Sequence, residues 1–264
     1  MNVFVVRRVT YFLLAKYDKF VGKRNDLFIL CYHSIGNDNW RFCTKVETFK
    51  KQIRILLKRY EAVQLCDVYD VVYGRKRLNN PSFAITFDDG YKDILKIKDF
   101  LKGFNIRPAL FIVSDRQNAR RDILKTQRDF LSDRDLVKLK NLGWEIGSHS
   151  STHRLLAPLD EKELEEEIKF SKIDLENRLS TNIKFFAYPK GNYSKKVLQL
   201  VKKSGYKLAL SMDDGEIKKG INTFRVPRIG VDATHNISEF QSLFSPSVMK
   251  FRKLVKTSFM GRFI

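Results

Sequence analysis

The chain has 264 residues, 43% of them hydrophobic, which is enough to bury a full core as one barrel-sized domain or two small ones. Its three cysteines, Cys31, Cys43 and Cys66, are irregularly spaced, which argues against a disulfide framework and indicates a reducing compartment. The formal net charge of +20 leaves nucleic acid, an anionic membrane or an acidic glycan as partners, and we expect no nucleic acid because no nucleic-acid-binding motif is present.

Residues 1–26 are predicted to form a basic and apolar extension. Arg7 and Arg8 divide its apolar stretch, and no small-residue cleavage site precedes Lys16, so it does not read as a signal peptide. The uncharged run over residues 9–15 is too short to span a bilayer. We therefore expect a soluble, cytoplasmic protein that is peripheral on the inner face of the cytoplasmic membrane.

Apolar runs alternate with helical segments over residues 27–245, with no linker and no repeat. The expected strands are 27–32, 62–65, 83–87, 109–113, 144–147, 184–188, 207–211 and 224–229. The expected helices are 44–60, opened by a capping box of Thr44 and Glu47, then 67–73, 91–102, 132–141, 159–179, 194–204 and 237–243. This alternation predicts a single α/β domain whose seven or eight parallel strands close into a (β/α) barrel.

The chemically suggestive residues all lie at the carboxyl ends of predicted strands, which form the rim where active sites of such barrels are built. They are His33, Asp88, Asp89, His149, His153, the turn at 189–191, and Arg228. An aspartate with two histidines in H-x-x-x-H spacing is a ligand set typical of an open, catalytic metal site. The second aspartate beside the first is an obvious general base.

The segments Thr86-Phe-Asp-Asp-Gly90 and His149-Ser-Ser-Thr-His153 resemble the paired motifs of the polysaccharide deacetylases, metal-dependent carbohydrate esterases with a distorted (β/α) barrel. The resemblance covers about residues 27–244. It implies that Asp88 is the general base and that Asp89, His149 and His153 bind the metal. It implies a glycan that contains an N-acetylated hexosamine as substrate. Zn²⁺ is the expected metal, and the ligand types also permit Co²⁺, Ni²⁺, Fe²⁺ or Mn²⁺.

Two features depart from the family pattern. The turn Tyr188-Pro189-Lys190-Gly191 lacks the arginine that normally precedes it, and the late histidine that acts as general acid is missing. His235, in a polar and loop-like setting, is expected at the surface. The early His33 resembles the acid of the circularly permuted branch, which includes poly-N-acetylglucosamine deacetylases.

The resemblance implies that the backbone amide of Lys190, which follows Pro189 in the turn, binds the oxyanion that forms when water attacks the acetamide. Strand alternation predicts that Arg228 replaces the missing arginine through a salt bridge to Asp88, with Arg225 as the competitor and a surface position as the alternative.

Residues 246–264 are expected to form a basic amphipathic tail. Val248, Phe251, Val255 and Phe259 fall at helical spacing among lysines and an arginine, which fits a helix in a membrane interface or an ordinary helix packed on the barrel. For function, the alternative to an N-deacetylase is a catalytically inactive glycan-binding or scaffold barrel at the membrane. The motifs do not distinguish a polymer, a lipid-linked sugar and a lipopolysaccharide precursor as substrates, but the basic, apolar termini favour an N-acetylated glycolipid at the cytoplasmic membrane face.

Overall fold

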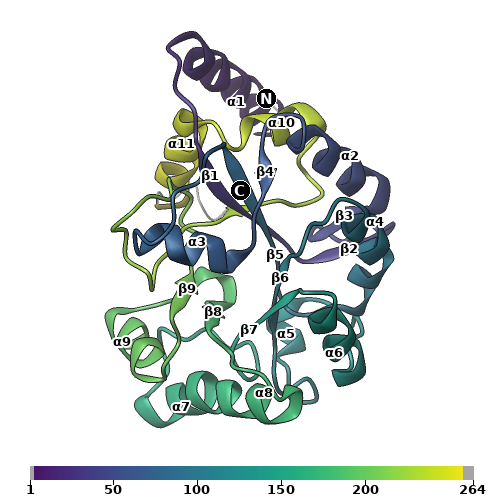
Figure 1. The fold of residues 1–264 in the computed structure, drawn as a ribbon, viewed down its shortest axis with the longest axis vertical. Coiled ribbons are helices and arrows are strands. Elements are labelled where there is room, and N and C mark those ends of the chain that lie inside the picture. Colours follow the sequence, from purple (N-terminus) through teal and green to yellow (C-terminus); the bar gives the residue numbers. More distant parts are fainter. Residues whose placement is uncertain (1–2, 258–264) are drawn as a thin grey trace.

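A computed structural model describes residues 3–257, and it is a parallel barrel surrounded by helices (Figure 1). The strands of the sheet run in the order β10-β1-β5-β6-β7-β8-β9, with β4 paired to β5, and every pairing is parallel. They are β1 (Leu27–Tyr32), β4 (Glu61–Ala62), β5 (Ser82–Phe87), β6 (Ala109–Ile112), β7 (Glu145–Ser148), β8 (Phe185–Ala187), β9 (Leu208–Leu210) and β10 (Ile229–Gly230). A separate parallel pair, β2 (Ser34–Gly36) and β3 (Cys43–Lys45), follows β1.

The barrel closes through the segment that precedes β10. The Val226 N–H donates to the carbonyl of Ala209 at 2.9 Å, and the Ser211 N–H donates to the carbonyl of Val226 at 2.8 Å, while β10 itself pairs with β1. The predicted strand over 224–229 is therefore present mainly as an isolated bridge and a short strand. Pro227, which has no N–H, lies between the two parts. The predicted distorted barrel is confirmed.

Helices surround the barrel (Figure 1). They are α1 (Val3–Phe20), α2 (Val46–Leu56), α3 (Leu65–Val72), α4 (Lys98–Gly103), α5 (Arg121–Leu124), α6 (Asp133–Asn141), α7 (Glu161–Glu165), α8 (Ser171–Leu179), α9 (Lys195–Lys203), α10 (Ile237–Ser242) and α11 (Pro246–Thr257). The 3-10 helices η1 (Lys92–Ile97) and η3 (Pro189–Gly191) and the π-helical turn η2 (Glu166–Phe170) complete the helical elements. In residues 3–257, none of these helices is long and apolar enough to cross a bilayer.

Alternate strand residues face two hydrophobic cores, as expected for strands buried on both sides. Phe28 and Leu30 of β1 join a large cluster beneath the outer helices. Leu27 and Ile29 join a smaller interior cluster to which α3 contributes Leu65 and other residues. The continuous apolar runs of the sequence follow from this double burial.

Three local predictions about helices are wrong. The expected helix over 91–102 divides into the 3-10 helix η1 and the helix α4. Thr44 does not open α2, because it lies in β3 and the N-cap is Lys45, which makes no side-chain cap. The expected continuous helix over 159–179 is interrupted by a π-helical turn, η2, between α7 and α8. Ser132 and Ser194 do cap α6 and α9, as predicted.

The two terminal helices lie side by side at one end of the barrel (Figure 1). Asp18 of α1 accepts hydrogen bonds from the N–H and hydroxyl of Ser247, at 2.7 and 2.6 Å. Val248 is buried, and Arg252 forms a 2.9 Å ion pair with the buried Asp214. Over the described residues α11 is thus a helix packed on the barrel, the alternative left open above; Phe259 lies outside the described residues.

Deleting residues 246–264 is therefore expected to destabilise the fold. The deletion uncovers Val248 and removes both cationic partners of the Asp214 carboxylate, Arg252 and Lys256. Leaving a buried charge unpaired costs about 3–5 kcal/mol. Urea denaturation should show a large fall in the free energy of unfolding, whereas deletion of 258–264 alone serves as the control. An unchanged unfolding midpoint for the longer deletion would contradict this account of α11.

Candidate active site

The turn after β5 carries both aspartates at the rim. Asp88 and Asp89 are buried, and Asp89 adopts a left-handed backbone with a φ of 69°. Gly90 follows with a φ of 80°, and a Cβ there would approach Ile112 Cδ1 to 2.8 Å. A left-handed conformation costs a residue other than glycine roughly 1–2 kcal/mol. The strained turn thus aims the two adjacent carboxylates in different directions.

Asp89, His149 and His153 come together as a three-residue cluster. The Oδ1 atom of Asp89 lies 3.4 Å from His149 Nε2 and 3.3 Å from His153 Nε2, and the ligand atoms all lie within 4.8 Å of one another. Asp89 Oδ1 is buried without a hydrogen-bond partner among the described residues. Two ligand atoms bound tetrahedrally at about 2.0–2.1 Å would lie about 3.4 Å apart. The donor set and its spacing therefore fit a small divalent cation.

The backbone of β8 orients His149. The Nδ1 atom of His149 lies 2.8 Å from the carbonyl oxygen of Ala187, so this nitrogen is the N–H donor and Nε2 carries the lone pair that faces Asp89. Burial lowers the pKa of His149 to about 4, outweighing the nearby Asp88 carboxylate that raises it. His149 is accordingly a neutral imidazole near pH 7, the form that binds metals.

The loop from His149 to His153 is held by Glu167, a residue that no sequence motif marks. The Glu167 carboxylate accepts hydrogen bonds from the N–H groups of Ser151 and Thr152, at 3.1 and 2.9 Å, and from the Thr152 hydroxyl. Glu167 is buried and belongs to η2, the π-helical turn. Such turns frequently occur at functional sites. The interruption of the predicted helix thus places a carboxylate beneath the histidine loop.

Replacing Glu167 by Ala should weaken metal binding without removing any ligand. The N–H groups of Ser151 and Thr152 would lose their acceptor, and the loop that positions His153 would loosen. Loss of an outer partner of this kind typically reduces metal affinity about 10–100-fold. Competition with a metal-binding dye measures the affinity, and the exposed neighbour Glu166→Ala is the matched control. Equal affinities for the two variants would remove Glu167 from the site.

Arg228 forms the predicted salt bridge with Asp88. Its Nη1 and Nη2 atoms donate to the two Asp88 carboxylate oxygens at 2.6 and 2.7 Å, and Nη1 also lies 3.1 Å from the Thr86 hydroxyl. Arg228 is fully buried, whereas the competitor Arg225 is exposed and pairs with Asp213. Burial alone would raise the pKa of Asp88, but the Arg228 guanidinium holds it below its usual value. Asp88 is therefore ionised and fixed in orientation.

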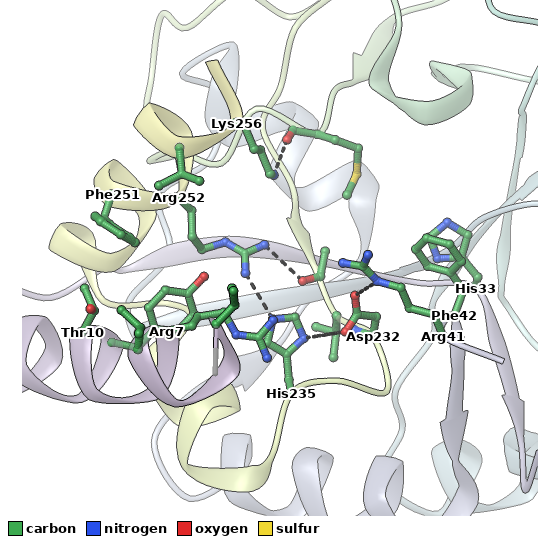
Figure 2. A pocket seen from close by; sticks show the side chains of 17 residues that line it. Arg7, Thr10, His33, Arg41, Phe42, Asp232, His235, Phe251, Arg252 and Lys256 are labelled. Carbon is green, nitrogen blue, oxygen red and sulfur yellow. Dashed lines mark hydrogen bonds and ion pairs between the residues drawn. The ribbon is translucent and has the colours of Figure 1, made fainter. Parts of the chain in front are cut away.

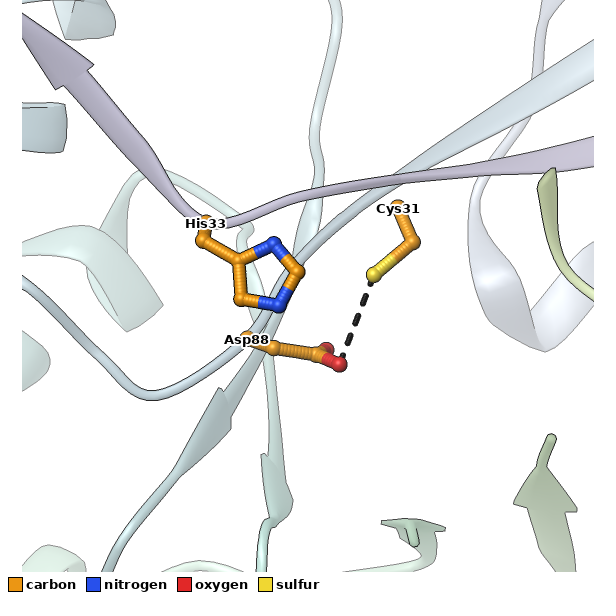
Figure 3. Close-up of side chains that lie close together, drawn as sticks. All are labelled: Cys31, His33 and Asp88. Atoms are coloured by element: carbon orange, nitrogen blue, oxygen red, sulfur yellow. Dashed lines mark hydrogen bonds between the residues drawn. The ribbon is translucent and has the colours of Figure 1, made fainter. Parts of the chain in front are cut away.

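A second cluster, of Cys31, His33 and Asp88, borders the same carboxylate (Figure 3). The Cys31 thiol donates to Asp88 Oδ2 at 3.4 Å, and burial raises the pKa of Cys31 well above its usual value. A neutral thiol and a carboxylate already paired with Arg228 make a poor metal site. The His33 ring faces Asp88 in Figure 3 and stacks at a tilt on Phe42, with 5.0 Å between centroids.

The remaining predicted residues form a tight turn after β8. Tyr188 and Pro189 are buried, and the Tyr188 hydroxyl donates to the carbonyl of Phe224 at 2.9 Å. Lys190, inside the turn, is exposed and adopts a left-handed backbone conformation with a φ of 53°. The turn begins one residue beyond Ala187, whose carbonyl accepts from His149. The oxyanion role of the Lys190 amide stays a prediction.

The expectation that His235 is a surface residue is wrong. His235 is buried, with Nδ1 3.2 Å from an Asp232 carboxylate oxygen and Nε2 3.3 Å from Arg252 Nη1. Asp232 also accepts from the Thr234 hydroxyl and from Arg41, and Thr234 accepts from Arg7 of α1, so these polar side chains near His235 are paired within the protein. His235 belongs to the junction between the rim and the terminal helices, apart from the Asp89 cluster.

A parallel barrel with an ionised aspartate and an Asp-His-His cluster at its rim defines a class of hydrolytic (β/α)-barrel proteins. The family described as Polysaccharide deacetylase matches residues 75–209, and the chain belongs to this family. YxkH of Bacillus subtilis (strain 168), a candidate polysaccharide deacetylase, is 23% identical over 214 residues, which are 80% of this chain and 74% of YxkH.

Two solved structures share the fold over most of their length. The deacetylase PplD of Streptococcus pyogenes, solved in complex with acetate, is 20% identical, with a TM-score of 0.72 over 83% of this chain and 98% of PplD. IcaB from Ammonifex degensii is also 20% identical, with a TM-score of 0.73 over 85% of this chain and 97% of IcaB. The likeness to these structures concerns the fold.

Proposed function

We propose that this protein is a metal-dependent hydrolase that removes N-acetyl groups from an N-acetylhexosamine-containing glycan. One observation carries the proposal: Asp88, paired with Arg228, adjoins the mutually facing Asp89, His149 and His153 at the rim. Membership of the polysaccharide deacetylase family supports the reaction. Nitrogen and oxygen donors in an open site favour Zn²⁺, and Co²⁺, Ni²⁺, Fe²⁺ or Mn²⁺ suit the same donor types.

Different residues of the chain would carry out the separate steps of the reaction. When bound, the cation would polarise a carbonyl and make water more acidic. Asp88, kept ionised by Arg228, would accept the proton of the water that attacks the acetamide carbon, and the Lys190 amide would donate to the developing oxyanion. His33 would give a proton to the amine nitrogen as the C–N bond breaks. The products are acetate and a free amino sugar.

Mass spectrometry tests this proposal directly. Glycans of the cell envelope and N-acetylglucosamine oligomers would be incubated with the metal-loaded protein. Each converted sugar should lose the mass difference between an acetyl group and a hydrogen atom. A protein that binds the glycans and leaves their masses unchanged would instead be the inactive, glycan-binding barrel.

Replacing His33 by Gln should lower kcat without removing the metal. Loss of a general acid typically costs about 10²–10⁴-fold in rate. The loss should be smaller for an acetyl ester than for an acetamide, because an alcohol leaves more easily than an amine. Parallel kinetics on an O-acetyl and an N-acetyl substrate measure the difference, with metal content as the control. Equal losses on both substrates would contradict the acid role.

We also propose that the enzyme works at the cytoplasmic face of an anionic membrane, on a glycolipid or a lipopolysaccharide precursor. The net charge of +20 and the free state of Cys31, Cys43 and Cys66 support this setting. Flotation with phosphatidylglycerol vesicles should recover the protein, and added salt should weaken the binding. Recovery that does not depend on anionic lipid would contradict the proposal.

A further inference from the structure

An apolar cavity separates the terminal helices from the rim that carries His33. It has a volume of about 580 Å³, and Figure 2 shows α1 and α11 on one side of it and His33 with Phe42 on the other. Its wall includes Val6 and Thr10 of α1, Phe251 of α11, and Val231. A volume of this size lies in the range of about 300–1,000 Å³ that is usual for small-ligand sites. Because His33 lines the cavity, the cavity borders the proposed active site.

The charged groups in the wall are already paired with protein partners. Arg7 Nε lies 2.9 Å from Glu239 Oε1, and Arg252 Nε lies 2.9 Å from Asp214 Oδ1. Asp232 accepts from Arg41 at 2.9 Å. Such paired charges offer little to an anion or a sugar hydroxyl. The rest of the surface that faces the cavity consists mainly of carbon atoms, so the wall suits a hydrocarbon chain.

The outer face of α1 points away from this cavity and is apolar as well. Val5, Val9, Phe12 and Leu13 are exposed at helical spacing, and Leu13 is 59% exposed. Basic side chains of the helix lie around this face, namely Arg8, Lys16 and Lys19. An exposed apolar stripe bordered by lysine and arginine is the pattern of a helix lying in an anionic membrane interface.

The two faces of α1 thus connect the membrane side with the active-site side. The same helix that presents Val9 and Leu13 outward contributes Thr10 and Tyr11 to the cavity wall. We propose that the cavity binds the hydrocarbon chain of a lipid-linked N-acetylated amino sugar whose sugar lies at Asp88 and His33. This inference rests on the proposed deacetylase function and names its substrate class. A polymer substrate carries no group that would fill the cavity.

A series of alkyl glycosides tests the inference. The metal-loaded full chain would be given methyl, butyl, octyl and dodecyl N-acetylglucosaminides, each below its micelle concentration. Each methylene that enters the cavity should lower KM about fourfold, the factor expected for one buried CH₂, and kcat should change little. Thr10→Trp, which fills the cavity from α1, should move the dodecyl-to-methyl ratio of kcat/KM toward one, and Thr10→Ser is the matched control.

The outcomes separate this inference from the proposed function. Deacetylation that is independent of chain length in the unaltered protein would overturn the cavity assignment while leaving the deacetylase intact. If no glycoside is deacetylated, the proposed function fails, but calorimetry with dodecyl glucoside and octyl glucoside still tests the cavity. Tighter binding of the dodecyl compound supports a hydrocarbon site. Equal binding of the two compounds, or no binding, overturns it. The unaltered protein decides the matter even if Thr10→Trp does not fold.

Discussion

The Asp88→Asn variant is expected to keep its metal and lose its activity. Asparagine has nearly the shape of aspartate, so Asp89, His149 and His153 should keep their positions around a cation. An amide cannot accept the proton of the attacking water, and loss of a general base typically costs about 10²–10⁴-fold in kcat. Metal content, measured by elemental analysis beside acetate release, checks both halves of this prediction.

The same change affects Arg228 and needs a structural control. Arg228 is fully buried and donates to both Asp88 oxygens, so an uncharged partner leaves its positive charge uncompensated and lowers stability. The thermal midpoint of Asp88→Asn should therefore fall, and activity must be measured well below it. Asp99→Asn, at an exposed position, is the matched control. An Asp88→Asn protein with near-normal activity would show that another group is the base.

Removing any one of the three proposed ligands should remove metal and activity together. Asp89→Ala, His149→Ala and His153→Ala each leave two donors, too few for the three protein ligands of an open catalytic site. His149→Ala should be the most damaging of the histidine changes, because it also leaves the Ala187 carbonyl without its donor in a buried position.

The matched control for these variants is His235→Ala, which removes another buried histidine outside the Asp89 cluster. Its metal content should equal that of the unaltered protein. Elemental analysis of the four purified variants gives the comparison. A full complement of metal in His149→Ala or His153→Ala would refute the ligand assignment.

The parts of the site that depend on the alternation of strands and helices along the chain were predictable from the sequence. Asp88 and His149 each follow an apolar run, and parallel strands bring such positions to one rim. The alternation of side chains along a strand was also sufficient to place Arg228 toward the barrel mouth. Successive side chains point to opposite faces of the sheet, so a shift of the strand by one residue would turn Arg228 to the other face.

The parts that depend on contacts between distant elements were not predictable in this way. Glu167 reads as one more acidic residue on a helix, and only the folded loop at Ser151 and Thr152 gives its carboxylate two N–H donors. From the sequence, His235 is expected at the surface because its neighbours along the chain are polar. Its partner Arg252 is 17 residues away on α11. The cavity likewise needs α1 and α11, from opposite ends of the chain, to be adjacent.

The most direct test of the proposed function is acetate release by protein that has been stripped of metal and then supplied with Zn²⁺. N-acetylglucosamine oligomers and dodecyl N-acetylglucosaminide would be the substrates, with acetate and free amine measured in the same samples. We expect equal amounts of acetate and amine, only with metal, and almost none from Asp88→Asn. Acetate release that is the same before and after metal removal, or none from either substrate with metal bound, would contradict it.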